Sequence, residues 1–256
     1  MTAFRDLDAR KKTSPDAAAK IPTFCSSVAL KLSNADGHLQ NILAITEWDY
    51  LTASSAPPTV SGSGLSGGTG VTMTTTSSSI YSSPIFPTIS TKSAFITNHL
   101  DDFFSNIFST LDVFAQILNL FYLSPPMKES DVYFFDVVKE IAALPAPKDQ
   151  IKKLLSGCLK APLYVNAKKY RKITTHSNSL RFRVLTESDP FALVQLPPKI
   201  AAIFIPDNPR VAPLTYLEKR DFRSFGPRVL KHTQAIVNSS YGIMERTVRA
   251  VDQIPV

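Results

Sequence analysis

A basic segment in the second half of this 256-residue sequence carries the side chains best suited to chemistry with an anionic partner. Between positions 139 and 183 there are eleven lysines and arginines but only two acids, Glu140 and Asp149. This local excess of positive charge is larger than the net charge of the whole chain, +7. Clustered cations bind nucleic-acid phosphates, and Tyr164 and Tyr170 in the same segment could stack on bases. A solvated helix face explains the same charges about equally well.

The run YRKITTH, residues 170–176, lies inside this basic segment and places Arg171 and His176 five positions apart. This spacing resembles the ribonuclease motif of the HEPN superfamily (higher-eukaryote and prokaryote nucleotide-binding helical domains). Two further stretches, SAFITNHLDDFFSNIFSTLDVFAQILNLFYL and VLKHTQAIVNSSYGIMERTV, also resemble a bacterial subgroup of that superfamily. In outline the resemblance covers residues 93–250.

Metal-free RNA cleavage is the chemistry that this resemblance implies, with the ribose 2′-OH attacking the neighbouring phosphate. His176 would move protons at the 2′-OH or the departing 5′-oxygen, because an imidazole titrates near neutral pH. Arg171 would stabilise charge on the scissile phosphate. Lys172 departs from the family pattern, which usually has a polar residue such as Asn or Asp there. Residues five apart lie about 140° apart on a straight helix, so a shared site needs the helix to end near Thr175 or two subunits to combine.

The leading hypothesis is therefore a dimeric, metal-independent endoribonuclease of the toxin or phage-defence type. Its expected partners are RNA and a second copy of the chain, with an antitoxin or a nucleotidyltransferase as further candidates. No cofactor and no metal ligands are expected. Besides the catalytic pair Arg171 and His176, the candidate substrate-binding residues are Lys168, Lys169, Tyr170, Lys172, Arg181 and Arg183.

Two other classes of protein fit the same residues. One is a catalytically silent HEPN-like module that holds nucleic acid or a nucleotide through the basic segment. The other is a structural helical scaffold whose basic face is only solvated. An assay for RNA binding and cleavage separates the three hypotheses.

Helices are predicted wherever apolar residues recur at steps of three and four. The strongest pattern spans 93–123 and ends before Pro125 and Pro126. Both faces of that segment are apolar near LNLFYL, so we expect a second subunit to cover part of it. The other predicted helices span 36–51, 131–144, 147–156, 161–177 and 222–250, with 93–123 and 222–250 packed lengthwise.

The predicted fold is mainly α: a HEPN-like bundle of long antiparallel helices with a small β excursion before the last helix. Alternating runs between 180 and 206 predict two or three strands. Residues 1–35 are interpreted as a flexible arm, and 36–256 as one domain interrupted by a disordered loop at 54–91. Ser, Thr, Gly and Pro make up most of that loop, and its SGSGLSGGTG run lacks the following Gly-Lys that a phosphate-binding loop needs.

The remaining composition excludes several classes of protein. Two cysteines permit no disulfide framework, and the four histidines are scattered without metal-ligand spacing. No signal peptide or membrane span is evident, so a cytoplasmic protein is expected. Four single residues carry their own predictions: Asp112 points inward, Cys158 lies in the core, His99 is packed or on the surface, and His232 faces solvent.

Overall fold

The computed structural model describes residues 15–47, 91–145, 149–174, 180–187, 199–210 and 212–252. The side chains of residues 15–18, 91, 172–174 and 250–252 are outside this description. The elements follow in the order α1 Pro15–Leu43, α2 Thr91–Tyr122, a 3-10 turn Glu129–Asp131, α3 Phe134–Ala143, α4 Asp149–Lys160, α5 Pro162–Thr174, β1 Arg183–Glu187, β2 Lys199–Phe204 and α6 Phe222–Asp252.

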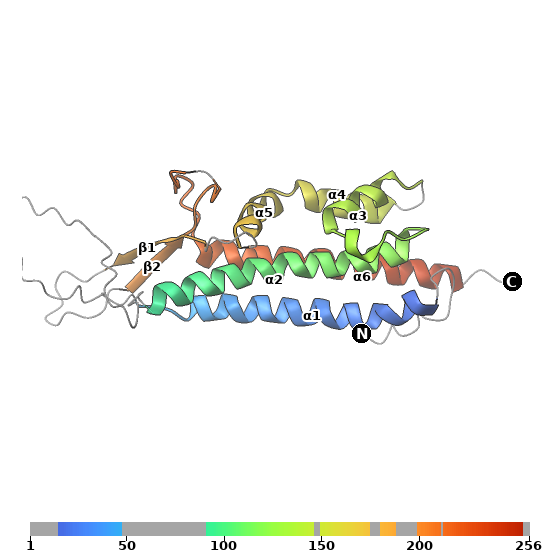
Figure 1. Cartoon of the computed structure of the whole chain (residues 1–256), viewed down its shortest axis with the longest axis horizontal. Coiled ribbons are helices and arrows are strands. Elements are labelled where there is room, and N and C mark those ends of the chain that lie inside the picture. The colour runs from blue at the N-terminus through green and yellow to red at the C-terminus, as the bar shows by residue number, and fades with distance from the viewer. Residues whose placement is uncertain are drawn as a thin grey trace, which may run out of the picture.

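Three long helices, α1, α2 and α6, lie lengthwise beside one another, and the short helices α3, α4 and α5 lie along one side of them (Figure 1). The two strands sit at one end of the bundle, where α1 ends and α2 and α6 begin. The prediction of a mainly α fold with a small β excursion before the last helix is confirmed. Within the described part of the chain, no helix has the length and hydrophobicity needed to cross a bilayer.

Helix α1 shows that the prediction of a flexible arm over residues 1–35 is wrong for its second part. The helix begins at Pro15 and ends at Leu43, so the predicted helix over 36–51 starts too late and also ends too late, since residues 44–47 are not helical. Residues 1–14 and 48–51 lie outside the described residues. The overlooked signal is a run of mostly apolar residues at alternating steps of four and three, which is the spacing of a helix that packs along another helix. They are Ile21, Cys25, Val28, Leu32, Ala35, Leu39 and Ile42.

Helix α2 carries the matching pattern and runs antiparallel to α1. The His38 ring meets His99 near the strand end of the bundle, and Lys20 Nζ lies 2.8 Å from Glu129 Oε2 at the other end. The apolar residues of α1 and α2 are buried where these two helices pack against each other and against the other helices. The buried residues of α2 at alternating steps of four and three are Ile96, Leu100, Phe103, Ile107, Thr110, Phe114 and Ile117, of which only Thr110 is polar.

The third long helix, α6, runs antiparallel to α1 and parallel to α2. Phe222, at its start, packs edge-to-face against Phe103, and Tyr241 packs edge-to-face against Phe114. These contacts agree with the prediction that the two longest apolar helices pack lengthwise. At Gly226 an added Cβ would lie 2.9 Å from Leu39 Cδ1, so glycine allows α6 to approach α1 closely.

Much of the C-terminal half of α2 is buried within a single chain. Leu111, Phe114, Ile117 and Leu118 are each at most 2% exposed. Asn119 completes this end of the helix, because its side chain donates to Met127 O at 3.0 Å and accepts from Met127 N at 2.8 Å. Leu120 and Phe121 nevertheless remain only partly buried, so the expected cover of this end by a second subunit, and the dimer itself, stay predictions.

The two described strands form an antiparallel pair in which Arg183 faces Phe204 and Val184 faces Ile203. The register shifts between Leu185 and Thr186. The run at 191–196, a candidate for a third strand, lies outside the described residues. So do Pro147, where the helix predicted over 147–156 begins, and most of the loop at 54–91. Only Thr91 of that loop is described, as the first residue of α2.

We expect Leu39→Ala to lower the free energy of unfolding by about 2–4 kcal/mol, because Leu39 is 2% exposed between α1 and α6. The matched control is Leu30→Ala on the same helix, where the side chain is 62% exposed and the expected change is within about 0.5 kcal/mol. Urea denaturation followed by circular dichroism measures both. Equal stability of the two variants would mean that α1 does not pack as described.

Candidate nucleic-acid interface

Helix α5 positions six of the residues that the sequence singled out, and its amphipathic pattern decides which way they point. Tyr164, Ala167 and Tyr170 recur every three residues and are buried against the bundle. Lys168 and Lys169 lie between them on the outward side and are half-buried. Since residues three or four apart share a helix face, the outward face of α5 joins Val165 to these two lysines.

Tyr170 is a core residue, so the prediction that it stacks on bases is wrong. Its side chain is 0% exposed, and its ring is stacked on Phe104 with centroids 4.8 Å apart. The hydroxyl donates to Pro206 O at 2.6 Å and accepts from the Arg220 guanidinium. Burial raises the pKa of Tyr170 to about 12, although Arg220 opposes that shift. Tyr164 is also enclosed, at 8% exposed, and burial raises its pKa too.

Arg171, the predicted phosphate ligand, forms an ion pair with Asp112 of α2. Its guanidinium also lies over the Phe108 ring, 5.5 Å from the centroid. The other oxygen of Asp112 accepts the backbone N–H of Phe134, the first residue of α3, at 3.1 Å. The inward-pointing role predicted for Asp112 is thus confirmed: one carboxylate ties α5 and α3 to α2. The Arg171 side chain remains 30% exposed.

Several other cations of the basic segment have no ion pair with a carboxylate in the described part of the chain. Lys168 Nζ instead lies 4.8 Å from the Phe135 ring centroid, and the Arg183 guanidinium lies 4.4 Å from the Tyr216 ring centroid. We call this set the basic surface. Its members are Lys153, Lys160, Lys168, Lys169, Arg181 and Arg183, with Arg171 at its edge.

The segment 204–206 links the two parts of the basic surface. Phe204 pairs with Arg183 across the strands, and Pro206 accepts the hydrogen bond of Tyr170 near the end of α5. The same strand pair is anchored to α2, because Leu180 N donates to Asp101 Oδ1 at 3.0 Å. The fold therefore brings Arg183 of β1 toward the end of α5 that carries Arg171.

Two predicted residues remain untested by the structure. His176 lies outside the described residues, so its distance from Arg171 stays a prediction. Lys172 is helical in backbone, but its side chain is outside the description. Cys158, by contrast, is 2% exposed and lies in the core as predicted.

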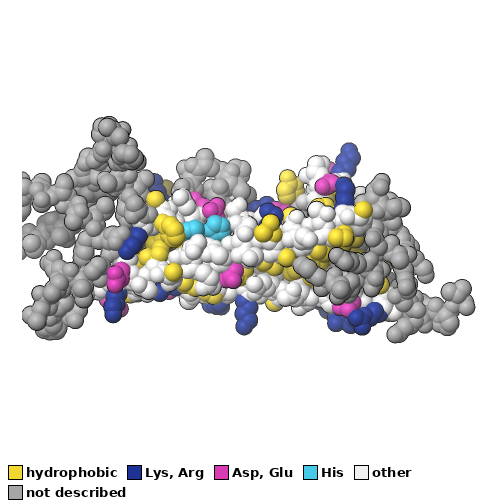
Figure 2. Space-filling model, turned by 90° about the horizontal axis from the view of Figure 1, so that it is seen from below, with side chains coloured by type: hydrophobic (Ala, Val, Ile, Leu, Met, Phe, Trp, Pro, Cys, Tyr) yellow, Lys and Arg dark blue, Asp and Glu magenta, His cyan; other side chains and the backbone are white. Residues whose placement is uncertain are grey.

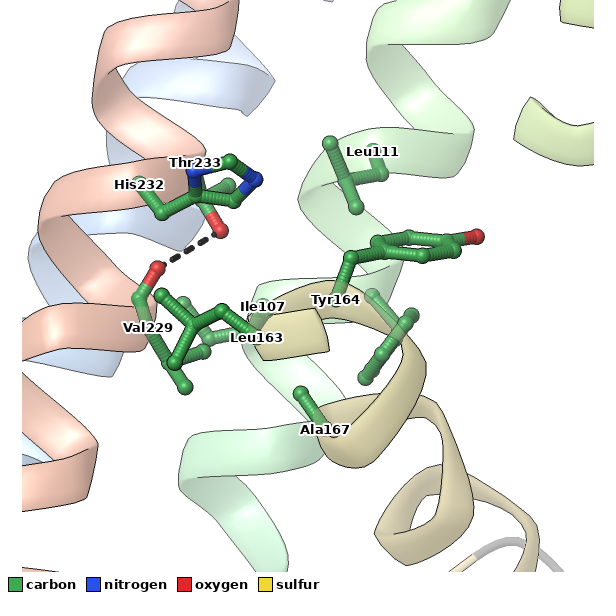
Figure 3. A pocket seen from close by; sticks show the side chains of 9 residues that line it. Ile107, Leu111, Leu163, Tyr164, Ala167, Val229, His232 and Thr233 are labelled. Atoms are coloured by element: carbon green, nitrogen blue, oxygen red, sulfur yellow. Dashed lines mark hydrogen bonds between the residues drawn. The ribbon is translucent and has the colours of Figure 1, made fainter. Parts of the chain in front are cut away.

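His232 is placed differently from its prediction as a solvent-facing residue. Its Nε2 atom is buried and has no hydrogen-bond partner within the described part of the chain. A small pocket between α2, α5 and α6, with room for about one water molecule, is lined by His232, Thr233, Tyr164 and six apolar residues (Figure 3). His232 follows Val229 by three positions and therefore falls beside the buried stripe of α6. Burial lowers its pKa.

The sequence analysis also did not predict the contact between two histidines, one on α1 and one on α2. His38 Nδ1 and His99 Nδ1 lie 2.7 Å apart, so one ring donates a hydrogen bond to the other. Asp102 lies 3.9 Å from His38. Histidine is visible on this face beside acidic and hydrophobic side chains (Figure 2). Burial and His38 lower the pKa of His99, while Asp102 opposes this. The described residues contain no group of three side chains placed to hold a metal ion.

Comparisons with known proteins identify no relative of this chain. No protein-family model matches it, and neither a curated protein nor a solved structure matches it. The functional assignment therefore depends on the residues and their arrangement.

We expect the chain to lose stability as the pH falls from about 7 to 5, with His232 contributing to the loss. The pKa of His232 is lower in the folded state than the ordinary value, near 6.5, of an unfolded chain. The unfolded chain therefore takes up a proton first, and its uptake favours unfolding as the pH falls through this window. His232→Gln cannot titrate and should show a smaller loss. The comparison is made by urea denaturation at both pH values, and identical losses would contradict the burial of His232.

Proposed function

We propose that this chain binds RNA through the basic surface of α4, α5 and β1. The observation that carries the proposal is the lack of carboxylate partners for Lys153, Lys160, Lys168 and Lys169 among the described residues, in a chain whose other cations include several ion-paired ones. Lysines without local partners keep counterions that a polyanion can displace, which favours binding of nucleic acid. A purely structural scaffold gives no reason for their concentration on one side.

The resemblance to HEPN proteins supports RNA as the polyanion and supports a further step, metal-independent cleavage. In that step the ribose 2′-oxygen attacks the adjacent phosphorus and the bond to the 5′-oxygen breaks. The proton of the 2′-OH goes to a base, and the 5′-oxygen receives a proton on leaving. His176 is our candidate for these proton transfers, and Arg171 for stabilising the phosphate charge.

The partial exposure of Arg171 is compatible with this role. Asp112 holds the guanidinium at the edge of the basic surface instead of leaving the long side chain free to rotate. A guanidinium has five N–H donors, so a carboxylate on one side does not prevent contact with a phosphate on another. The Asp112 contact would then position Arg171 without touching RNA.

We expect Lys169→Ala to weaken RNA binding and to lower the dependence of affinity on salt. For a single strand, each lost phosphate contact reduces the slope of log K against log salt by about 0.7. The matched control is Lys31→Ala, which removes the same charge from α1, on the side of α2 away from α5 (Figure 1). Fluorescence anisotropy with labelled RNA at several salt concentrations measures both.

An equal effect of Lys31→Ala and Lys169→Ala would mean diffuse attraction to a basic protein and would count against a defined surface. Tight binding of DNA of the same sequence would show that the ribose is not recognised. Absence of RNA binding by the wild type at low salt would refute the proposed function.

We expect the wild-type chain to cleave RNA in EDTA and to leave 2′,3′-cyclic phosphate ends. His176→Ala should abolish cleavage with little change in RNA affinity, because the imidazole acts in proton transfer. Arg171→Ala should lower both cleavage and affinity. Replacing the 2′-OH at the scissile position with hydrogen should block the reaction.

The three hypotheses give different outcomes in this assay. Cleavage lost in His176→Ala supports the nuclease. RNA binding without cleavage by the wild type supports the catalytically silent module. Equal cleavage by wild type and His176→Ala would reveal a contaminating nuclease and remove the case for catalysis.

A further inference from the structure

Two large aromatic side chains at the start of α3 are exposed. Tyr133 is 53% exposed and Phe135 is 48% exposed, while Phe134 between them is 2% exposed and packs toward Tyr164. Tyr133 occupies the position before the first turn of α3, and its side chain makes no capping hydrogen bond. Burial of Phe134 and the hydrogen bond from its N–H to Asp112 dock this end of the helix.

Phe135 is continuous with the basic surface. Lys168 Nζ lies 4.8 Å from the centroid of its ring, which joins the start of α3 to the outward face of α5. On that face of α5, Val165 is 46% exposed and lies one turn before Lys168 and Lys169. Exposed apolar area and lysine ammonium groups therefore alternate over one short stretch of surface.

The charged residues of α3 also place a cation, and no acid, on the face of the helix that carries Phe135. Lys139 lies four positions after Phe135, so it is on the same face of the helix, and it is exposed. The carboxylates of Asp136 and Glu140 are also four positions apart and form a separate strip, about 100–140° around the helix from Phe135. The ring is thus flanked by Lys139 on its own helix and by Lys168 on α5.

Resting on the proposed RNA binding, we propose that Phe135 is a stacking platform for unpaired bases, so that the ligand is single-stranded. Inside a duplex both faces of each base are covered by neighbouring base pairs, whereas an unpaired base can turn one face onto an aromatic ring. Lys139, Lys168 and Lys169 lie at the edge of this platform, where the phosphates of such a strand would pass. The platform takes the role that the sequence suggested for Tyr164 and Tyr170, both of which are buried.

The same exposed side chains could instead contact an apolar protein surface, including a second copy of the chain. Charge complementarity favours the nucleic acid, because the nearest cations of the platform have no carboxylate partner among the described residues. A protein contact would not require lysines on both sides of an aromatic ring. The two occupants give opposite results when Phe135 is changed.

The test compares a labelled 20-nucleotide oligouridine with the duplex that it forms with oligoadenosine. Phe135→Ala should weaken binding of the single strand roughly 5- to 100-fold and leave binding of the duplex unchanged. The slope of log K against log salt should stay as in the wild type, because stacking releases no counterions, whereas Lys169→Ala should lower it. Phe135→Leu keeps an apolar side chain without a ring and should behave like Phe135→Ala. Leu30→Ala, at an exposed position of α1, is the control for loss of surface apolar area.

Each alternative outcome has a separate meaning. If Lys169→Ala weakens binding but both Phe135 variants bind the single strand as the wild type does, the platform is refuted and RNA binding stands. If Phe135→Ala disrupts self-association in sedimentation while its affinity for oligouridine is unchanged, the patch is a contact between copies and the platform is likewise refuted. If the wild type binds neither strand nor duplex, both the proposed function and the platform fail. Thermal melts confirm that the Phe135 variants remain folded, as expected for an exposed side chain.

Discussion

Because α2 carries buried apolar side chains on more than one face, several elements have to cover it, and the other helices are arranged to do so. Helix α1 covers it along its length, α6 packs parallel to it, and α3 and α5 close the remaining side. Its phenylalanines carry much of this burial, since Phe103, Phe104, Phe108 and Phe114 are each at most 2% exposed. Removing any one of the covering helices would expose aromatic side chains whose burial contributes about 1.5–3 kcal/mol each.

The burial of α2 also decides what α5 presents to solvent. Tyr170 and Arg171 are adjacent in sequence, yet Phe104 holds the first in the core and Asp112 holds the second at the edge. One carboxylate on α2 therefore fixes both the orientation of α5 and the start of α3, where Phe134 N–H is its second partner. The basic surface and the aromatic side chains at the start of α3 are neighbours because both helices are tied to the same residue.

The polar side chains of this chain fall into two groups with different physical roles. In the first group, charges are satisfied inside the fold. Burial alone would raise the pKa of Asp207, but hydrogen bonds from Thr215, Leu217 N and Glu218 N, together with Arg220, lower it. Asp207 thereby orders the loop that leads into α6. The second group is the lysines of α4 and α5, which contribute no described ion pair to the fold. Charges of the second kind are available for a ligand, and this contrast is the main physical support for an RNA-binding surface.

The sequence by itself determined the helices whose signal is local. Apolar residues at steps of three and four located α2 and α6 within two residues at each end, because one strong stripe specifies a helix whatever it packs against. The β excursion was located by alternating apolar residues and by prolines, which are also local signals. Helix α1 was missed because its stripe includes Cys25 and Ala35, whose small side chains suit close packing but give a weak pattern.

Only the tertiary structure decided which side chains of those helices are enclosed. Tyr170 and Lys169 are equally plausible ligands of RNA in the sequence, and burial against Phe104 separates them. The pairing of His38 with His99 and of Arg171 with Asp112 joins residues about sixty positions apart, which no local spacing encodes. An apolar pattern predicts that one face of a helix is buried. Which residues of its polar face contact a partner depends on helices that are distant in the chain.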